Sequence, residues 1–519
     1  MTIDRRRFLQ LSAAASLPLT LPKSSFAIAK HSGTDLVVAV QSNPPQFDPL
    51  RLQTNIAFRV LANVYDFPFR TEFRKELVRR LPGLAEESRW VDERTIELKL
   101  RNAVKFHSGD QMTAEDFAFS FGPERMGPDV PGGPLAKQYF ASFESVSAVD
   151  NLTVRIRTTS VDPLLEMRLA GWGSQIISKR AFLASGGWDK WALSPVATGP
   201  YKVANVRTGD FVRLEAHEAY WGGSPVFRSV TFKVVPDAAG RANGLLAGDY
   251  HIATDISPDQ LGIFEGQHDI EPVGGQIFNM RVLNYDATEG LLKDPRIRQA
   301  LDAAIDRDAI AKSLFAGKVE VPRGFQWPAY GDIFIESEPP LRRNLALAKR
   351  LLSEASYKGE PIPYRVLSDY YTAELTTAQI LVQMWKEAGL NIQLQICENW
   401  TQVWAKPNGG IFNGSINLVY PDPAGTLWPL YGPTGFIRTS SKSWSDADFD
   451  ELGSRLLATA DRAERKALHA KILQIFGHDN PPGTPLHFSA MFYGQRKDVA
   501  WSPVPLPYMD FGPFNVKRS

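Results

Sequence analysis

Histidines are the side chains of this chain that could most readily perform acid–base catalysis or bind a metal ion. Eight occur in 519 residues, and no two have the four-residue spacing of a metal-binding helix. His217-Glu218, for example, lacks the second histidine of a metalloprotease helix. Isolated histidines are more often exposed or hydrogen-bonded within a core. We therefore expect no metal site and no catalytic residue among them.

The cysteine and the carboxylate pairs give no stronger support for an enzyme. Cys397, the single cysteine, lies in a strand-like apolar segment and is typical of a small buried hydrophobic residue. One cysteine also excludes an internal disulfide, a cysteine-based zinc site and an iron–sulfur cluster. Glu86-Glu87 and Glu115-Asp116 are sequence neighbours at turns or helix starts, where capping explains them. Neither a G-x-S-x-G motif nor a phosphate-binding loop occurs, so we expect no resident cofactor.

Aromatic residues form the more informative group. The chain has 12 Trp, 15 Tyr and 30 Phe. Several lie late in the sequence among Asn, Pro and Gly, at Trp400, Trp404, Tyr420, Trp428 and Tyr431. Aromatic side chains on irregular segments suit a pocket that binds by stacking and shape, although core packing is an equal alternative for each of them.

The elements that would position these side chains change character along the chain. A short apolar run and several alternating segments predict strands at 36–40, 95–100, 153–157, 201–206, 211–215 and 230–235. After about residue 284 the apolar period changes to that of helices. Helices are predicted from Asp294-Pro295 as far as Gly317, at 345–355, at 375–388 and at 446–476 with a break near 461, and a strand at 391–396. The pattern predicts a mixed α/β chain.

The N-terminus predicts export. Arg5-Arg6-Arg7-Phe8-Leu9 precedes an apolar stretch at 11–21, and small residues follow at Ser25-Phe26-Ala27 or Ala27-Ile28-Ala29. A charged start, a short apolar middle and a small-residue end are typical of a secretory signal. The arginine pair before Phe-Leu indicates a twin-arginine signal, which exports folded proteins. We expect residues 1–29 to be the signal peptide and the mature protein to be periplasmic.

Composition excludes two classes of partner. Lys and Arg number 58 against 57 Asp and Glu, a formal charge of +1, so the basic excess of a nucleic-acid-binding protein is absent. We find no 18-residue apolar run free of charge and proline, so we expect no insertion into a membrane.

A chain of 519 residues suggests more than one domain. No clean linker is visible, which favours two lobes connected by several chain crossings.

Segments spread along the mature chain share the pattern of a known family. They are residues 100–109 with 113–117, 198–201, 294–301 with 304–307, 385–390 and 420–423. Together and in this order, they resemble the family 5 extracellular solute-binding proteins, which are the dipeptide, oligopeptide and nickel receptors of ABC importers. Each match alone is weak, whereas the set spans nearly the whole mature chain.

The resemblance implies an α/β, periplasmic-binding-protein-like fold of cluster C type, with two lobes joined by a hinge and an extra subdomain. Lobe I would comprise 30–66, 195–278 and 489–519, with the extra subdomain inserted at 67–194; lobe II would comprise 279–488. A small-molecule ligand would bind in the cleft between the lobes. The protein, expected to be a monomer, would deliver that ligand to an inner-membrane ABC permease with ATPase subunits.

The resemblance also implies which residues contact the ligand. Trp400 falls where peptide-binding members place a pocket tryptophan. Asn417 and Tyr420 are expected in the cleft beside it. Asn279, at the crossing between the lobes, and Asn55, in the segment after the first strand, complete the expected ligand-binding set.

One departure from the family pattern bears on the ligand. In peptide-binding members, an aspartate just before the Tyr-Pro-Asp-Pro-like segment pairs with the α-ammonium of the ligand; here that position is Val419. Asp422 is expected to be a turn former before Pro423. We therefore expect a small polar solute, peptide-like or opine-like, without the usual ammonium anchor. An oligosaccharide receptor, an exported hydrolase or cofactor enzyme, and a sensory or chaperone role are the alternatives.

Overall fold

The computed structural model describes residues 35–52, 54–74, 77–368 and 370–516. The predicted signal peptide, residues 1–29, lies outside the described residues. Across the described ranges, no helix is both long and apolar enough to cross a lipid bilayer.

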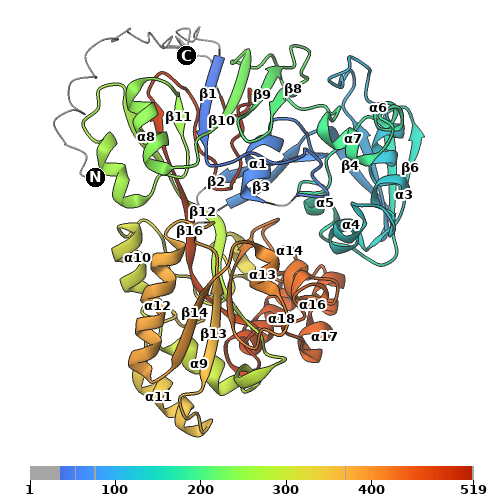
Figure 1. Cartoon of the computed structure of the whole chain (residues 1–519). Coiled ribbons are helices and arrows are strands. Elements are labelled where there is room, and N and C mark those ends of the chain that lie inside the picture. The colour runs from blue at the N-terminus through green and yellow to red at the C-terminus, as the bar shows by residue number, and fades with distance from the viewer. Residues whose placement is uncertain (1–34, 53, 75–76, 369, 517–519) are drawn as a thin grey trace, which may run out of the picture. The chain divides into compact units, whose positions relative to one another are not determined.

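A large mixed sheet runs through the described part of the chain (Figure 1). In spatial order its strands are β14 (Asn391–Ile396), β13 (Pro361–Val366), β15 (Ile411–Asn417), β12 (Ile270–Tyr285), β16 (Gly483–Arg496), β11 (Ile252–Ala253), β1 (Asp35–Val40), β10 (Ser229–Val234), β9 (Phe211–Ala216) and β8 (Tyr201–Arg207). The strands predicted at 36–40, 201–206, 211–215, 230–235 and 391–396 are β1, β8, β9, β10 and β14.

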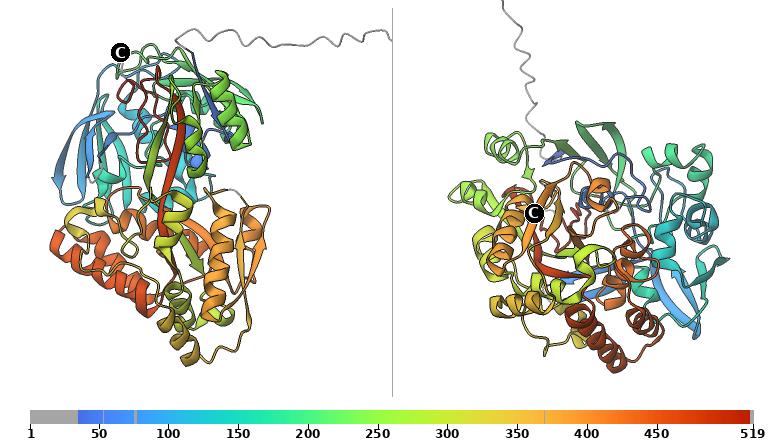
Figure 2. Two further views of the ribbon diagram at one scale, coloured as in Figure 1. Left: turned by 90° about the vertical axis from the view of Figure 1, so that its left-hand side faces the viewer. Right: turned by 60° about the horizontal axis from the view of Figure 1, so that its bottom comes forward.

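The two longest strands, β12 and β16, join two groups of elements and pair with each other in antiparallel register. On one side β16 pairs with β11 of lobe I, and on the other β12 pairs with β15 of lobe II. Figure 1 shows the two strands running together between these groups, and Figure 2 keeps them adjacent from a second direction. The predicted two-lobe fold with a hinge is confirmed, whereas the exact domain boundaries stay a prediction.

The ladder between β12 and β16 is interrupted where the lobes meet. Gln276 pairs with Ala490, but the next pair is Met280 with Phe488, so residues 277–279 oppose Ser489 alone. Extra residues on one strand break the regular hydrogen bonding and bend the strand locally. The paired strands are therefore irregular at the place where the lobes meet.

Lobe I is built on the β1 side of the sheet. One face of β1 is fully buried, with Leu36, Val38 and Val40 all 0% exposed, whereas on the other face Ala39 is buried and Val37 is half-buried. Helix α1 (Asn55–Leu61) starts at Thr54, whose hydroxyl accepts a hydrogen bond from the Ala57 amide at 3.2 Å. Helix α8 (Ala238–Ala247) packs near β11 and β16.

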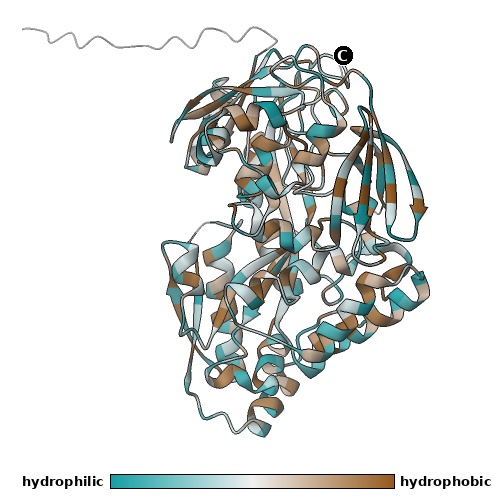
Figure 3. Cartoon of the chain, turned by 90° about the vertical axis from the view of Figure 1, so that its right-hand side faces the viewer, coloured by the Kyte–Doolittle hydropathy of each residue, from teal (hydrophilic) through white to brown (hydrophobic). Residues whose placement is uncertain are grey.

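A separate antiparallel sheet forms the extra subdomain. Its strands, in spatial order, are β4 (Ala85–Asp92), β5 (Thr95–Leu100), β7 (Thr153–Thr158) and β6 (Phe143–Asp150), and the hairpin β2 (Phe69–Arg74) and β3 (Leu77–Pro82) precedes it. Hydrophilic and hydrophobic residues alternate along these strands (Figure 3), and the apolar residues of the two central strands, such as Ile96 of β5 and Val154 and Ile156 of β7, are fully buried. The helices here are α2 (Ala114–Ser120), α3 (Pro123–Met126), α4 (Gly133–Phe140), α5 (Leu165–Arg168), α6 (Lys179–Ala184) and α7 (Trp188–Leu193).

Lobe II surrounds the β13–β15 side of the sheet with helices. They are α9 (Pro295–Ala303), α10 (Arg307–Phe315), α11 (Leu345–Glu354), α12 (Glu374–Ala388), α13 (Trp400–Trp404), α14 (Pro423–Thr426), α15 (Trp428–Tyr431), α16 (Phe436–Thr439), α17 (Ala447–Ala458) and α18 (Arg462–Gln474). Trp385 of α12 is fully buried and donates its indole N–H to the carbonyl of Leu301 at 2.9 Å. Gly389 ends α12 at φ 97°, in the left-handed region, as predicted.

The predicted helix from Asp294 to Gly317 is wrong in one respect, because it is two helices. Asp306 accepts a hydrogen bond from the Ala309 amide at 2.9 Å and so caps a new helix, α10. A competing N-cap outweighs continuous apolar periodicity. The break predicted near 461 is confirmed, since Asp461 caps α18 through the Glu464 amide at 2.7 Å.

Candidate functional site

The largest cavity at the predicted site lies against β15 and has a volume of about 380 Å³. Thr54 of lobe I and Gln138 and Tyr139 of the extra subdomain also reach it. Its aromatic lining consists of Tyr139, Tyr370, Tyr371, Trp400, Trp404, Phe412 and Phe436, and its amide lining includes Gln138, Asn284, Asn413 and Asn417. A cavity with aromatic walls and a few amides suits a small organic solute.

The aromatic wall is organised by α13. Asn399 caps this helix by accepting a hydrogen bond from the Gln402 amide at 3.0 Å. Trp400 and Trp404 are four residues apart and therefore share one face, where their rings stack with centroids 5.3 Å apart and planes at 20°. Tyr370 meets Trp400 edge-on at 5.0 Å. The structure thus places Trp400 in the cavity lining, as expected.

Two of the three predicted asparagines, Asn279 and Asn417, bond to each other. Asn417 ends β15 and is paired across the sheet with Asn279 of β12. The Asn279 amide donates to the Asn417 side-chain oxygen at 2.7 Å, and the Ser489 hydroxyl donates to the Asn279 side-chain oxygen at 2.5 Å. Asn417 lines the cavity, whereas Asn279 is only 1% exposed and lies behind it. Asn279 therefore ties together β12, β15 and β16 at the break in the ladder.

Val419 and Tyr420 differ in their surroundings. Half-buried Val419 lines the 380 Å³ cavity and also a neighbouring cavity of about 340 Å³. Tyr420 is 3% exposed and is absent from the lining of both cavities. Its hydroxyl donates to the Ala424 carbonyl at 3.1 Å, and its ring lies 5.6 Å from the Arg168 guanidinium. The structure therefore gives Tyr420 a packing position beside the site.

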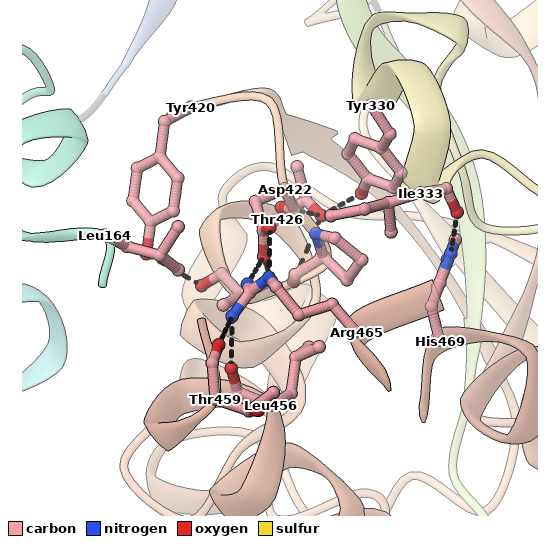
Figure 4. Close-up of polar contacts among 12 residues, drawn as sticks. Leu164, Tyr330, Ile333, Tyr420, Asp422, Thr426, Leu456, Thr459, Arg465 and His469 are labelled. Atoms are coloured by element: carbon pink, nitrogen blue, oxygen red, sulfur yellow. Dashed lines mark hydrogen bonds and ion pairs between the residues drawn. The ribbon is translucent and has the colours of Figure 1, made fainter. Parts of the chain in front are cut away.

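Asp422 has a structural role, as its position before Pro423 predicts (Figure 4). It caps α14 by accepting a hydrogen bond from the Ala424 amide at 2.8 Å. It also forms an ion pair with Arg465, at 2.5 and 3.1 Å, and both side chains are 2% exposed. Arg465 donates further to the carbonyls of Leu456 and Thr459. This buried pair fixes the segment that carries Val419 and the adjoining cavity wall.

A second cavity of about 60 Å³ lies where the lobes meet. Lobe I contributes Gln41, Asn55, Arg59 and Asp255, and lobe II contributes Arg281, Tyr370, Tyr371 and His487. Asn55 reaches this cavity because it is the first residue of α1. Tyr370 and Tyr371 line both cavities, so the smaller one adjoins the aromatic wall of the larger. Asn55 is thus placed apart from Trp400 and Asn417, on the other side of the two tyrosines.

The ionisable groups of the smaller cavity are held in defined states. Arg59 donates to both oxygens of Asp255 at 2.8 and 2.9 Å. Burial opposes ionisation of Asp255, but the charges of Arg59 and Arg241, together with hydrogen bonds from Arg59 and Thr254, outweigh it and hold the pKa of Asp255 below its usual value. Burial lowers the pKa of His487 to about 4, so its imidazole is neutral at pH 7.

The sequence analysis missed Tyr370, Tyr371 and Arg281. The tyrosine pair sits between β13 and α12 as two adjacent aromatic residues, which was a usable signal. Arg281 is a charged residue within the buried half of β12, another signal of a special position. The analysis also missed that His107 and His217 meet, with ring centroids 5.2 Å apart. Both rings contact the Gly199 carbonyl. In the described ranges, no group of three His, Cys, Asp or Glu side chains could hold a metal ion.

Two lobes joined by paired strands, with cavities at their junction, define a ligand-binding protein of the periplasmic-binding-protein type. The family model for "Bacterial extracellular solute-binding proteins, family 5 Middle" matches residues 80–437, more than half of the chain. The chain belongs to this family, and its role is to bind a solute. The family consists of solute-binding proteins rather than enzymes, which fits the expectation that the chain has no catalytic residue.

Curated relatives match over nearly their whole length. Di/tripeptide-binding protein 1 of Pseudomonas aeruginosa is 25% identical, covering 91% of this chain and 92% of the relative. The glutathione-binding protein GsiB of Pectobacterium atrosepticum is 26% identical, covering 90% of each chain.

Solved structures share the fold. A dipeptide-binding protein from Pseudoalteromonas sp. SM9913 in complex with Met-Leu has a TM-score of 0.83 at 20% identity, covering 93% of this chain and 100% of the other. NikZ from Campylobacter jejuni in complex with Ni(L-His) has a TM-score of 0.79 at 19% identity, covering 90% of this chain and 95% of the other.

Proposed function

We propose that this protein is the periplasmic receptor of an ABC importer and that it captures a small peptide-like or opine-like solute. The cavity against β15 carries this proposal, because aromatic rings and amides from lobe II and the extra subdomain line it and Thr54 of lobe I reaches it. The names of the relatives, which bind dipeptides, tripeptides and glutathione, support the substrate class. The receptor would deliver the solute to an inner-membrane permease with ATPase subunits.

Ligand capture in such a cleft is a population shift. Contacts that a solute makes with both lobes stabilise the closed arrangement only by the difference in its binding free energy between open and closed forms. A micromolar receptor has about −8 kcal/mol of binding free energy, so a few well-desolvated contacts are sufficient. The Trp400–Trp404 wall and the Asn417 amide supply contacts of this kind. Together with Asn55, they form the proposed ligand-binding set, which Asn279 supports from behind.

The proposal is tested by thermal shift and calorimetry on the purified protein. The panel consists of dipeptides, tripeptides, glutathione, opines, maltooligosaccharides and Ni(L-His). A ligand present far above its Kd stabilises the folded state by a few kcal/mol, which raises the midpoint of unfolding. We expect stabilisation by members of the peptide or opine classes. Chemical turnover of a compound, or binding by none of the peptides and opines, would contradict the proposal.

An oligosaccharide is the second candidate, and one observation favours it. The stacked Trp400–Trp404 pair presents aromatic surface to the cavity, and such surfaces also bind the apolar faces of sugars. The same panel separates the two candidates. Binding of maltooligosaccharides without binding of peptides or opines would select the sugar receptor.

Export by residues 1–29 and a monomeric state belong to the same proposal. The arginine pair Arg6-Arg7 before Phe8-Leu9 supports the twin-arginine route. Replacing both arginines with lysine is expected to keep the protein in the cytoplasm, as cell fractionation would show. Unchanged export of this variant would contradict the route. Light scattering on the purified protein is expected to give the mass of a single chain.

A further inference from the structure

Arg281 is a buried cation whose hydrogen-bonding capacity the described protein groups leave partly unused. Its side chain lies on β12, is 4% exposed, and faces the smaller cavity between the lobes. One guanidinium nitrogen donates to the Gly414 carbonyl at 2.8 Å, and the guanidinium carbon lies 3.4 Å from the Tyr371 ring centre. Among the described residues, no carboxylate forms an ion pair with it. Buried charges in proteins are normally paired, so this one points to a partner that the described residues do not supply.

Three other buried arginines of the described chain show the contrast, whereas Arg125 also lacks an ion pair there and donates only to the Ser120 and Gln175 carbonyls. Arg59 is paired with Asp255, and Arg465 with Asp422. Arg241 lacks an ion pair, but its guanidinium donates to four main-chain carbonyls. Arg281 has one carbonyl acceptor and a side-chain contact with Tyr371, and it faces a cavity, so part of its guanidinium remains available to a ligand.

The described carboxylates near Arg281 already accept hydrogen bonds from other residues. Asp255, across the smaller cavity, accepts two hydrogen bonds from Arg59. Glu374, 2% exposed, accepts from the Asn413 amide at 2.7 Å and from the Tyr371 main-chain amide at 3.1 Å. The other titratable groups that line the cavity are Arg59, Tyr370, Tyr371 and His487, and the His487 ring is bonded to the Phe488 carbonyl at 2.7 Å. The position open to a new acceptor therefore lies in the cavity itself.

The size and connection of this cavity suit a carboxylate. About 60 Å³ corresponds to roughly two water molecules, which is room for a carboxylate group but not for a whole peptide. The Tyr371 hydroxyl, 3.2 Å from the Ser415 hydroxyl, offers further polar contact at the same wall. Because Tyr370 and Tyr371 line both cavities, a solute lying in the larger one can reach Arg281 with one end.

We propose that Arg281 anchors a carboxylate of the solute, whose apolar part lies against the aromatic wall of the larger cavity. Arginine is suited to this because its planar fork binds a carboxylate through two hydrogen bonds. The inference rests on the proposed function and narrows it: the receptor selects its solute by an anionic end. With valine at position 419, the ammonium end is the dispensable one.

The test uses four compounds that remove each charge in turn: Leu-Phe, Leu-Phe amide, N-acetyl-Leu-Phe and N-acetyl-Leu-Phe amide. Their Kd values are measured by calorimetry. Loss of one partner of a buried charge pair weakens binding at least about 30-fold, so each amide is expected to bind that much more weakly than its acid. N-acetylation is expected to change the Kd less than about threefold. Similar Kd values for acid and amide, or no binding by either acid, would overturn the inference.

Variants then connect the acid preference to Arg281. Arg281→Met is expected to bind acid and amide equally, and Arg281→Lys, which keeps the charge for folding but loses the planar fork, to retain a reduced preference. Arg365→Met is the matched control, because Arg365 also belongs to this sheet and donates to the Ala405 and Pro407 carbonyls, but lines neither cavity. It is expected to keep the full preference. An unchanged preference in both Arg281 variants would overturn the assignment.

Failure of this inference and failure of the proposed function give different results. Peptides or opines that bind with no preference for the acid contradict the inference alone. Binding by no peptide or opine in the larger panel contradicts the proposed function as well.

Discussion

The substitution Val419→Asp addresses the main departure of this chain from the peptide-binding members that it resembles. Val419 is half-buried and lines both the 380 Å³ cavity and the neighbouring 340 Å³ cavity. A carboxylate at this position would face the place where a solute is expected to lie. We predict that it creates a preference for a free α-ammonium group that the natural protein lacks.

The magnitude follows from the surroundings of residue 419. Two unit charges 4 Å apart attract by about 4 kcal/mol at an effective dielectric constant of about 20, and by about 1 kcal/mol in water. A half-buried side chain between two cavities falls between these limits, and partial desolvation of the new carboxylate offsets part of the attraction. The net gain is about 1–2 kcal/mol, so the ammonium form should bind about 5–30-fold more tightly than its N-acetyl analogue.

The assay compares Leu-Phe with N-acetyl-Leu-Phe on three proteins. Val419→Asn is the matched control, because it has nearly the size of aspartate but no charge. We expect a Kd ratio near one for the natural protein and for the asparagine variant, and a ratio of about 5–30 for the aspartate variant. At 1 M salt the ratio should fall, since exposed charge pairs are screened.

Two results would refute this reasoning. The first is a natural protein that already prefers the free ammonium form more than about tenfold, because another group would then be its anchor. The second is an aspartate variant that folds, binds N-acetyl-Leu-Phe and shows no preference, because residue 419 would then lie away from the solute.

Three further predictions concern the aromatic wall, the buried ion pair and a buried histidine. Trp400→Ala should weaken solute binding at least tenfold, about 1.4 kcal/mol, whereas Trp90→Ala, at an exposed tryptophan of the subdomain, should not; equal Kd values would remove Trp400 from the site. Arg465→Met leaves its carboxylate partner buried and should reduce the free energy of unfolding by about 3–5 kcal/mol in urea titrations, so a loss below about 1 kcal/mol would contradict the importance of the pair. Burial lowers the pKa of His469 from 6.5 to about 4, so its contribution to stability is complete above about pH 6.5 and is lost as the pH falls towards 4. His469→Gln should therefore reduce the stability lost between pH 7.5 and pH 5 by about 2 kcal/mol, and His268→Gln, at an exposed position, should leave that loss unchanged.

Local sequence signals predicted the helices and strands that are determined by residues close to one another in the sequence. The alternation in β5 and β7, the proline-started helix α9 and the glycine-ended helix α12 all depend on residues within a few positions of one another. The break between α9 and α10 was missed because apolar residues at helical spacing lead up to Asp306, which is also a possible N-cap. Only the structure shows that Asp306 caps a new helix.

The hinge and much of the site could not be predicted in this way. β12 and β16 lie far apart in sequence, and their pairing depends on contacts that no local pattern encodes. Trp400 was identified through the resemblance and does line the cavity, whereas Tyr420, beside it in the same expected set, is packed behind the surface. Arg281 was missed because the sequence shows only a charged residue in an apolar strand. The structure is needed to show that its side chain faces a cavity and has a single carbonyl acceptor.

The position of β16 in the sheet has a consequence for the order in which the protein is made. Strands β12 to β15 pair among themselves in lobe II and are all synthesised by residue 417. Strand β16, at Gly483–Arg496, completes the sheet of both lobes, because its first half pairs with the second half of β12 and its second half stands between β11 and the first half of β12. Domains tend to fold as their residues leave the ribosome. The sheet must therefore wait for a strand that is made late, so β11 and β12 remain without one of their final partners until most of the chain has been translated, and the capacity to bind solute arises only near its end.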